Sequence, residues 1–293
     1  DFDILAKQKE FKTKKNIFKG DTVPSVELGV ALAAIENGHK DYSLNNFGLE
    51  SFKAKDRQPL VLGITGTGGA GKSSLIDEMV QRYLNAYPNK KIAVVCVDPS
   101  KRKTGGSLLG DRIRMNSLSR NHVYMRSVAS RGSGREIASS LPDILKFIRQ
   151  LDFDFIIAET SGIGQGNMAI TEVSDMSMYV MTSDFGAQSQ LEKIDMLDFA
   201  DFVAINKFDR KGSQDALRDV AKQVQRNREQ WNKSTDQMPV FGTQASRFND
   251  DGVTALYQGV LPRLTELGLK TAASKLTPVS VRFSSGRNAI VPP

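Results

Sequence analysis

The chain has 293 residues, of which 40% are hydrophobic and 25% are charged, and its formal net charge is +7. This balance is typical of a globular protein, and no run approaches the roughly 20 consecutive apolar residues that a membrane-spanning helix needs. A single cysteine, Cys96, excludes an intrachain disulfide and a thiolate zinc cluster, which favours a reducing compartment.

The positive charge is spread along the chain. Of the 40 basic residues, six occur over 7–19 and six over 210–228, and they do not gather in one stripe. A nucleic-acid site would need one basic stripe with stacking side chains, so we expect neither a nucleic-acid nor a membrane partner. The start at Asp1 has no initiator methionine and no signal peptide, which suggests a segment of a longer cytoplasmic polypeptide.

Residues 1–58 are charged and irregular, apart from a helical pattern over 26–36, and are interpreted as an amino-terminal linker or arm. Over 59–266, apolar runs alternate with segments of helical period, which predicts βα units and a parallel sheet buried on both faces. Strands are expected at 60–65, 91–97, 122–127, 153–159, 178–182, 202–206 and 239–242. Helices are expected at 73–86, 142–150, 188–197, 213–231 and 251–267. The fold class is therefore α/β, doubly wound and mostly parallel, followed by a carboxyl-terminal linker over 267–293.

Residues 66–73 read GTGGAGKS and match G-x-x-x-x-G-K-[ST] between a predicted strand and a predicted helix. Backbone N–H groups of such a loop hold phosphates, and the helix points its positive end at them. Lys72 is expected to reach the β- and γ-phosphates, and Ser73 to bind Mg²⁺. The residues of this loop predicted to bind nucleotide are Gly69, Ala70, Gly71, Lys72, Ser73 and Ser74.

Residues 206–209 read NKFD, match N-K-x-D and follow a predicted strand. The carboxylate of Asp209 would accept hydrogen bonds from the guanine N1–H and exocyclic amine, a donor pair that adenine lacks. A site with an acceptor that the wrong base leaves unpaired discriminates strongly. Residues 243–246, after the last predicted strand, are expected to add a backbone contact to the base. The two motifs together predict GTP as the nucleotide.

Two carboxylates stand at the ends of predicted strands. Asp98 follows the strand over 91–97, and Glu159 ends the strand over 153–159 before a glycine turn. Ligands bind at the carboxyl edge of open α/β sheets, so both are expected to position metal or water. Lys72, Asp98 and Glu159 are the predicted catalytic residues. Because small GTPases commonly carry aspartate at the position of Glu159, the glutamate indicates another class.

Residues 105–115 (GGSLLGDRIRM), with 97–100 (VDPS) and 159–165 (ETSGIGQ), resemble the MeaB/ArgK family of G-protein chaperones for adenosylcobalamin-dependent acyl-CoA mutases. Residues 184–197 (DFGAQSQLEKIDML) are more similar to the version fused inside isobutyryl-CoA mutase, where the G domain stands between a cobalamin-binding domain and a mutase barrel. The resemblance covers about residues 59–266. It implies a P-loop NTPase fold of the SIMIBI type with GTPase activity that gates cofactor loading and protects the mutase.

The resemblance also implies site residues. One or two Mg²⁺ ions would be surrounded by Ser73, Asp98, Asp111 and Glu159. The nucleotide would be contacted by Arg114, Asn206, Lys207 and Asp209. The resemblance further implies nucleotide-dependent switches over 98–115, 159–170 and 183–196, and a homodimer. The cobalamin signature D-x-H-x-x-G is absent, so adenosylcobalamin is expected in the parent protein but not on this chain.

Three alternatives remain at this point. A nickel-insertion GTPase of the hydrogenase or urease type would share the fold but would need Cys and His ligands. A small-molecule kinase would use the P-loop for ATP. A non-catalytic module would bind GTP without hydrolysing it.

Overall fold

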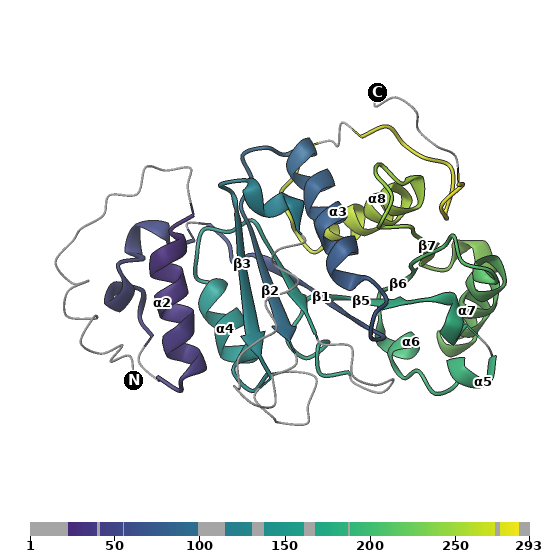
Figure 1. Cartoon of the computed structure of the whole chain (residues 1–293), viewed down its shortest axis with the longest axis horizontal. Coiled ribbons are helices and arrows are strands. Elements are labelled where there is room, and N and C mark those ends of the chain that lie inside the picture. Colours follow the sequence, from purple (N-terminus) through teal and green to yellow (C-terminus); the bar gives the residue numbers. More distant parts are fainter. Residues whose placement is uncertain are drawn as a thin grey trace.

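The computed structural model describes residues 23–39, 42–54, 56–98, 115–130, 138–160, 168–186, 188–272 and 276–286. Over these ranges seven strands form one sheet in the order β3-β2-β4-β1-β5-β6-β7, and every pairing is parallel (Figure 1). The strands are β1 (Leu60–Gly66), β2 (Ile92–Asp98), β3 (Val123–Ala129), β4 (Phe155–Glu159), β5 (Met176–Met181), β6 (Phe202–Ile205) and β7 (Val240–Gly242). Each end lies within two residues of the predicted one, and the doubly wound α/β fold is confirmed.

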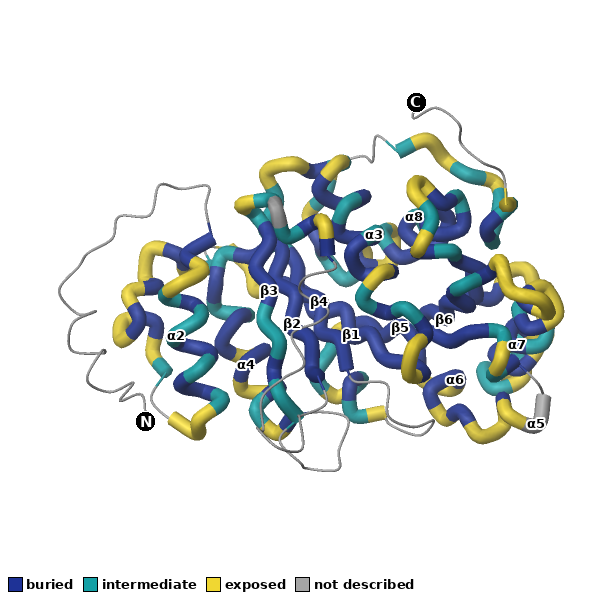
Figure 2. Tube along the Cα trace, in the orientation of Figure 1, coloured by how far each residue is buried: buried dark blue, intermediate teal, exposed yellow. Residues whose placement is uncertain are grey.

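Helices cover both faces of the sheet, which Figure 2 shows as a buried layer between more exposed elements. On one face lie α3 (Lys72–Ala86) and α8 (Asp251–Glu266), which bury Leu75 and Leu256 against the strands. The opposite face is covered by α4 (Leu141–Ile148), α6 (Met196–Phe199) and α7 (Ser213–Asn227). Burial on both faces explains why the strands are continuous apolar runs.

The helix predicted over 188–197 is wrong as a continuous element. The structure has two short helices, α5 (Gln188–Leu191) and α6 (Met196–Phe199), joined by a turn in which Ile194 N–H donates to Leu191 O over 3.1 Å. Ile194 and Met196 are both buried in the core. One straight helix would turn these two side chains roughly 200° apart, so the break lets both pack. The helix predicted over 213–231 is also too long, because α7 ends at Asn227.

The described part of the predicted amino-terminal arm packs into the core. It forms α2 (Ser25–Glu36), as predicted, and the 3-10 turns η1 (Leu44–Phe47) and η2 (Glu50–Phe52). Leu28 and Leu32 are fully buried, and Phe47 packs edge-on against Phe147 of α4 at a centroid distance of 6.2 Å. Arg126 of β3 forms an ion pair with Glu36 at 2.6 Å. The predicted domain boundary at residue 59 is therefore not an edge of the hydrophobic core.

The described residues that follow α8 also contact the domain. Gly242 of β7 pairs with Phe283 in an isolated parallel bridge, so the predicted carboxyl-terminal linker extends the sheet edge at this point. Among the helices that the structure describes, none has the length and hydropathy to cross a membrane.

Candidate functional site

The predicted phosphate loop joins β1 to α3 at the carboxyl edge of the sheet. Gly66 has φ +147°, and a Cβ there would lie 1.8 Å from the carbonyl oxygen of Val180. Gly71 has φ +86°, and its Cβ would lie 2.6 Å from Asn206 Nδ2. Both positions require glycine, because any side chain would be strained and would clash with a neighbour.

Lys72 is the first residue of α3 and is buried inside the loop. Its Nζ donates hydrogen bonds to the carbonyl oxygens of Gly66, at 3.3 Å, and Thr67, at 3.2 Å. Since a buried ammonium is costly unless it is paired, these carbonyls hold the cation in place. The loop therefore carries one fixed positive charge at the amino-terminal end of α3, while Ser73 and Ser74 follow in its first turn.

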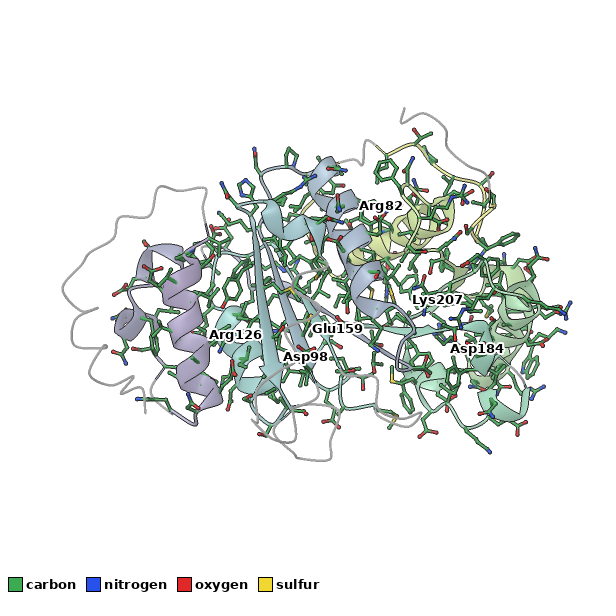
Figure 3. The ribbon with its side chains drawn as sticks, viewed as in Figure 1. Arg82, Asp98, Arg126, Glu159, Asp184 and Lys207 are labelled. Carbon is green, nitrogen blue, oxygen red and sulfur yellow. The ribbon has the colours of Figure 1, made fainter. Side chains whose placement is uncertain are left out.

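A hydroxyl and two carboxylates converge beside this helix end. Ser73 Oγ donates to Glu159 Oε1 over 3.1 Å, and Cys96 Sγ donates to Glu159 Oε2 over 3.4 Å. Cys96 and Glu159 are register partners in β2 and β4, and Asp98, two residues farther along β2, projects from the same face. Asp98 and Glu159 are both buried and lie near each other in Figure 3. The structure thus brings together three of the four residues predicted around metal.

One hydroxyl and two carboxylates fit Mg²⁺, which usually completes its coordination with phosphates and waters, better than they fit a metal ion whose ligands all come from the protein. Within the described ranges, no group of three or more His, Cys, Asp or Glu side chains could hold a metal ion. Mg²⁺ usually takes one or two carboxylates together with phosphates and waters. Asp111 and Arg114 lie outside the described residues.

Asn206 connects the phosphate loop to the other predicted motifs. Its Nδ2 donates to Ala70 O over 2.8 Å, and its Oδ1 accepts from Thr243 Oγ1 and from the Ala245 N–H, both at 3.1 Å. The side chain is 2% exposed. Asn206 therefore braces the phosphate loop against residues 243–246, a role that the motif alone did not predict.

Lys207 and Asp209 occupy the outer part of the same motif. Lys207 has φ +57°, a left-handed conformation, and its Cε lies 4.0 Å from the Cβ position of Gly71, so its stem follows the phosphate loop. Asp209 is exposed and lines a hollow of about 380 Å³ with Gln244 of the predicted base loop. The first turn of α7 and residues 284–286 complete this hollow.

Two residues of this region were missed by sequence reasoning. Asp250 is 1% exposed; its Oδ2 accepts hydrogen bonds from the Gln244 N–H, at 3.1 Å, and the Val253 N–H, at 2.9 Å. Its place before a helix is a recognisable capping signal. Arg82 of α3 is 6% exposed and donates to Asp250 O over 3.0 Å. No pattern in the sequence distinguishes this buried arginine from an exposed arginine on a helix surface. Together Asp250 and Arg82 connect the phosphate-loop helix to the base loop.

Sequence comparison matches the chain to one protein family. The profile of "Methylmalonyl Co-A mutase-associated GTPase MeaB" matches residues 28–275. The "Fused isobutyryl-CoA mutase" of Cupriavidus metallidurans is 57% identical over 267 residues, which is 91% of this chain and 24% of that protein. The chain thus spans about a quarter of that relative's length.

Solved structures agree with the fold. The LAO/AO transport system kinase superposes with a TM-score of 0.51 at 21% identity, covering 91% of this chain and 77% of that one. HypB from Helicobacter pylori, solved in complex with nickel, gives a TM-score of 0.51 at 16% identity, covering 84% and 99%. At these identities the similarity extends to the fold alone.

Proposed function

Because the chain belongs to the MeaB family of mutase-associated GTPases, we propose that it binds GTP with Mg²⁺ through residues 66–73 and 206–209 and hydrolyses it to control an acyl-CoA mutase. The observation that carries the site assignment is the bracing of the phosphate loop by Asn206, because it joins the phosphate and base motifs into one unit.

The described residues have distinct tasks in this proposal. Lys72 exchanges its two carbonyl partners for the β- and γ-phosphate oxygens. Ser73, Asp98 and Glu159 hold Mg²⁺, which when bound neutralises the phosphate charge. The amino-terminal N–H groups of α3 point at the same phosphates. With these charges in place, water attacks the γ-phosphate in line, and the protein contributes mainly positioning and electrostatic stabilisation.

The base site supplies nucleotide specificity. Asp209 and Gln244 line the same hollow, and Asp209 is exposed there. Its carboxylate is therefore free to accept hydrogen bonds from the N1–H and amine groups of guanine. An adenine ring presents no matching donor pair, so ATP would leave this carboxylate unpaired. GDP is held by the same groups after hydrolysis.

The mutase is proposed from the relatives. Proteins named fused isobutyryl-CoA mutase are 53–63% identical to this chain over most of its length, so the partner is an adenosylcobalamin-dependent mutase acting on isobutyryl-CoA, on the same parent polypeptide. The GTPase gates loading of adenosylcobalamin, which the mutase and its cobalamin-binding domain hold, and it works as a homodimer.

The test measures phosphate release from GTP and from ATP in the presence of Mg²⁺. The chain should hydrolyse GTP only, and Lys72→Ala should abolish this activity. Asp209→Asn should transfer preference from GTP to XTP, because the amide matches the xanthine edge. ATP turnover that Asp209→Asn leaves unchanged would support a small-molecule kinase, and GTP binding without phosphate release would support a non-catalytic module; either result would refute the proposal.

A further inference from the structure

Residues 282–286 are bound along the edge of the sheet beside the proposed base site. The Gly242 N–H donates to Arg282 O over 3.0 Å, and the Ser284 N–H donates to Gly242 O over 2.9 Å. The Arg282 guanidinium lies 4.6 Å from the ring centroid of Phe241. These contacts give the segment one defined path across β7.

An aromatic pair attaches this segment to the N-K-x-D motif itself. Phe208, the variable residue of the motif, packs on Phe283 with ring centroids 5.4 Å apart. A Cβ on Gly242 would lie 2.4 Å from the Phe208 ring, so glycine there lets the ring pass beneath the segment. Residues 206–209 and Phe283 are therefore in direct packing contact.

A buried carboxylate makes a second connection. Ser284 Oγ donates to Asp250 Oδ1 over 2.5 Å, while Asp250 Oδ2 accepts from the Gln244 N–H of the base loop. The Ser285 N–H donates to Asp251 Oδ1 over 3.0 Å. Hydrogen bonds to a buried carboxylate are strong, so Asp250 holds both residues 243–246 and residues 282–286.

We infer that Ser284, Ser285 and Gly286, which line one hollow together with Asp209 and Gln244, form a wall of the guanine subsite, so that a bound base holds residues 284–286 in place. The hollow they share, of about 380 Å³, has the size of a small-molecule site. This inference rests on the proposed function and adds to it a base-contacting segment that lies outside the nucleotide motifs.

Thiol labelling tests the wall directly, because the natural Cys96 is 1% exposed and should react slowly. In Ser285→Cys, saturating GDP and Mg²⁺ should slow modification of the new thiol about tenfold. The matched control is Asn232→Cys, an exposed position beyond the far end of α7, whose labelling rate should not change. If GDP binds but the thiol at position 285 is modified at an unchanged rate, the inference is overturned.

Two further variants separate the inference from the function on which it rests. In the double variant Asp209→Asn with Ser285→Cys, protection should transfer from GDP to XDP. If XDP binds but does not slow labelling at position 285, residues 284–286 do not line the base subsite, while the assignment of Asp209 to the guanine site stands. If Asp209→Asn leaves GDP affinity unchanged, the guanine site itself is wrong. Ser285→Trp should weaken GDP binding about tenfold by filling the hollow, and undiminished affinity would also contradict the wall.

Discussion

Replacing Asn206 by alanine tests whether this residue braces the loops or contacts the base. The substitution removes the hydrogen bonds of this side chain, a long one to Gly71 O at 3.4 Å included, and leaves the Ala70 carbonyl, the Thr243 hydroxyl and the Ala245 N–H without this partner. All three partners belong to buried residues. Each abandoned buried group costs about 1 to 3 kcal/mol, so we expect the free energy of unfolding to fall by about 3 to 5 kcal/mol.

Urea unfolding of the nucleotide-free chain, followed by circular dichroism, measures this change without any contribution from ligand binding. The matched control is Asp209→Ala in the same motif. Because Asp209 is exposed, its loss should change stability by less than about 0.5 kcal/mol while weakening guanine binding.

The opposite pattern would refute the bracing role. If Asn206→Ala lowered stability by less than about 1 kcal/mol yet abolished GDP binding, the side chain would act on the nucleotide rather than on the loops.

Three more predictions concern the metal site, a helix anchor and buried tyrosines. Glu159→Gln keeps an acceptor for Ser73 but removes the charge, so the Mg²⁺ concentration for half-maximal GTP hydrolysis should rise about tenfold, and an unchanged Mg²⁺ titration would contradict the metal role. Asp77 of α3 accepts hydrogen bonds from the N–H groups of Asn116 and Ser117, so in Asp77→Ala the free energy of unfolding should fall by about 2 kcal/mol and hydrogen exchange at both amides should accelerate. Unchanged exchange would show that Asp77 does not hold these two residues to α3. Burial raises the pKa of Tyr83 and Tyr257, so stability is retained below the ordinary tyrosine pKa of about 10 and falls as the pH rises above it, because only the unfolded chain ionises there. Replacing both by phenylalanine should flatten this alkaline loss in urea unfolding, and an unaltered slope would assign the loss to other groups.

Local patterns in the chain were enough to predict the strands and the nucleotide motifs, but not the order of the strands in the sheet. A strand buried on both faces is a continuous apolar run, so β2 could be recognised without any neighbour. The phosphate loop depends on glycine conformations and on the order strand, loop, helix, which are properties of consecutive residues. The resemblance to mutase-associated GTPases rested on similar short runs.

Tertiary structure alone decided how distant parts meet. The break between α5 and α6 and the burial of Leu28 depend on packing against elements far along the chain, which local periodicity does not encode. Asn206 donates to a carbonyl 136 residues away, and Ser284 donates to a carboxylate 34 residues away. A motif specifies residue types at fixed spacing, but hydrogen-bond partners depend on where the folded backbone places them. For that reason the phosphate loop could be predicted, and its connection to residues 282–286 could not.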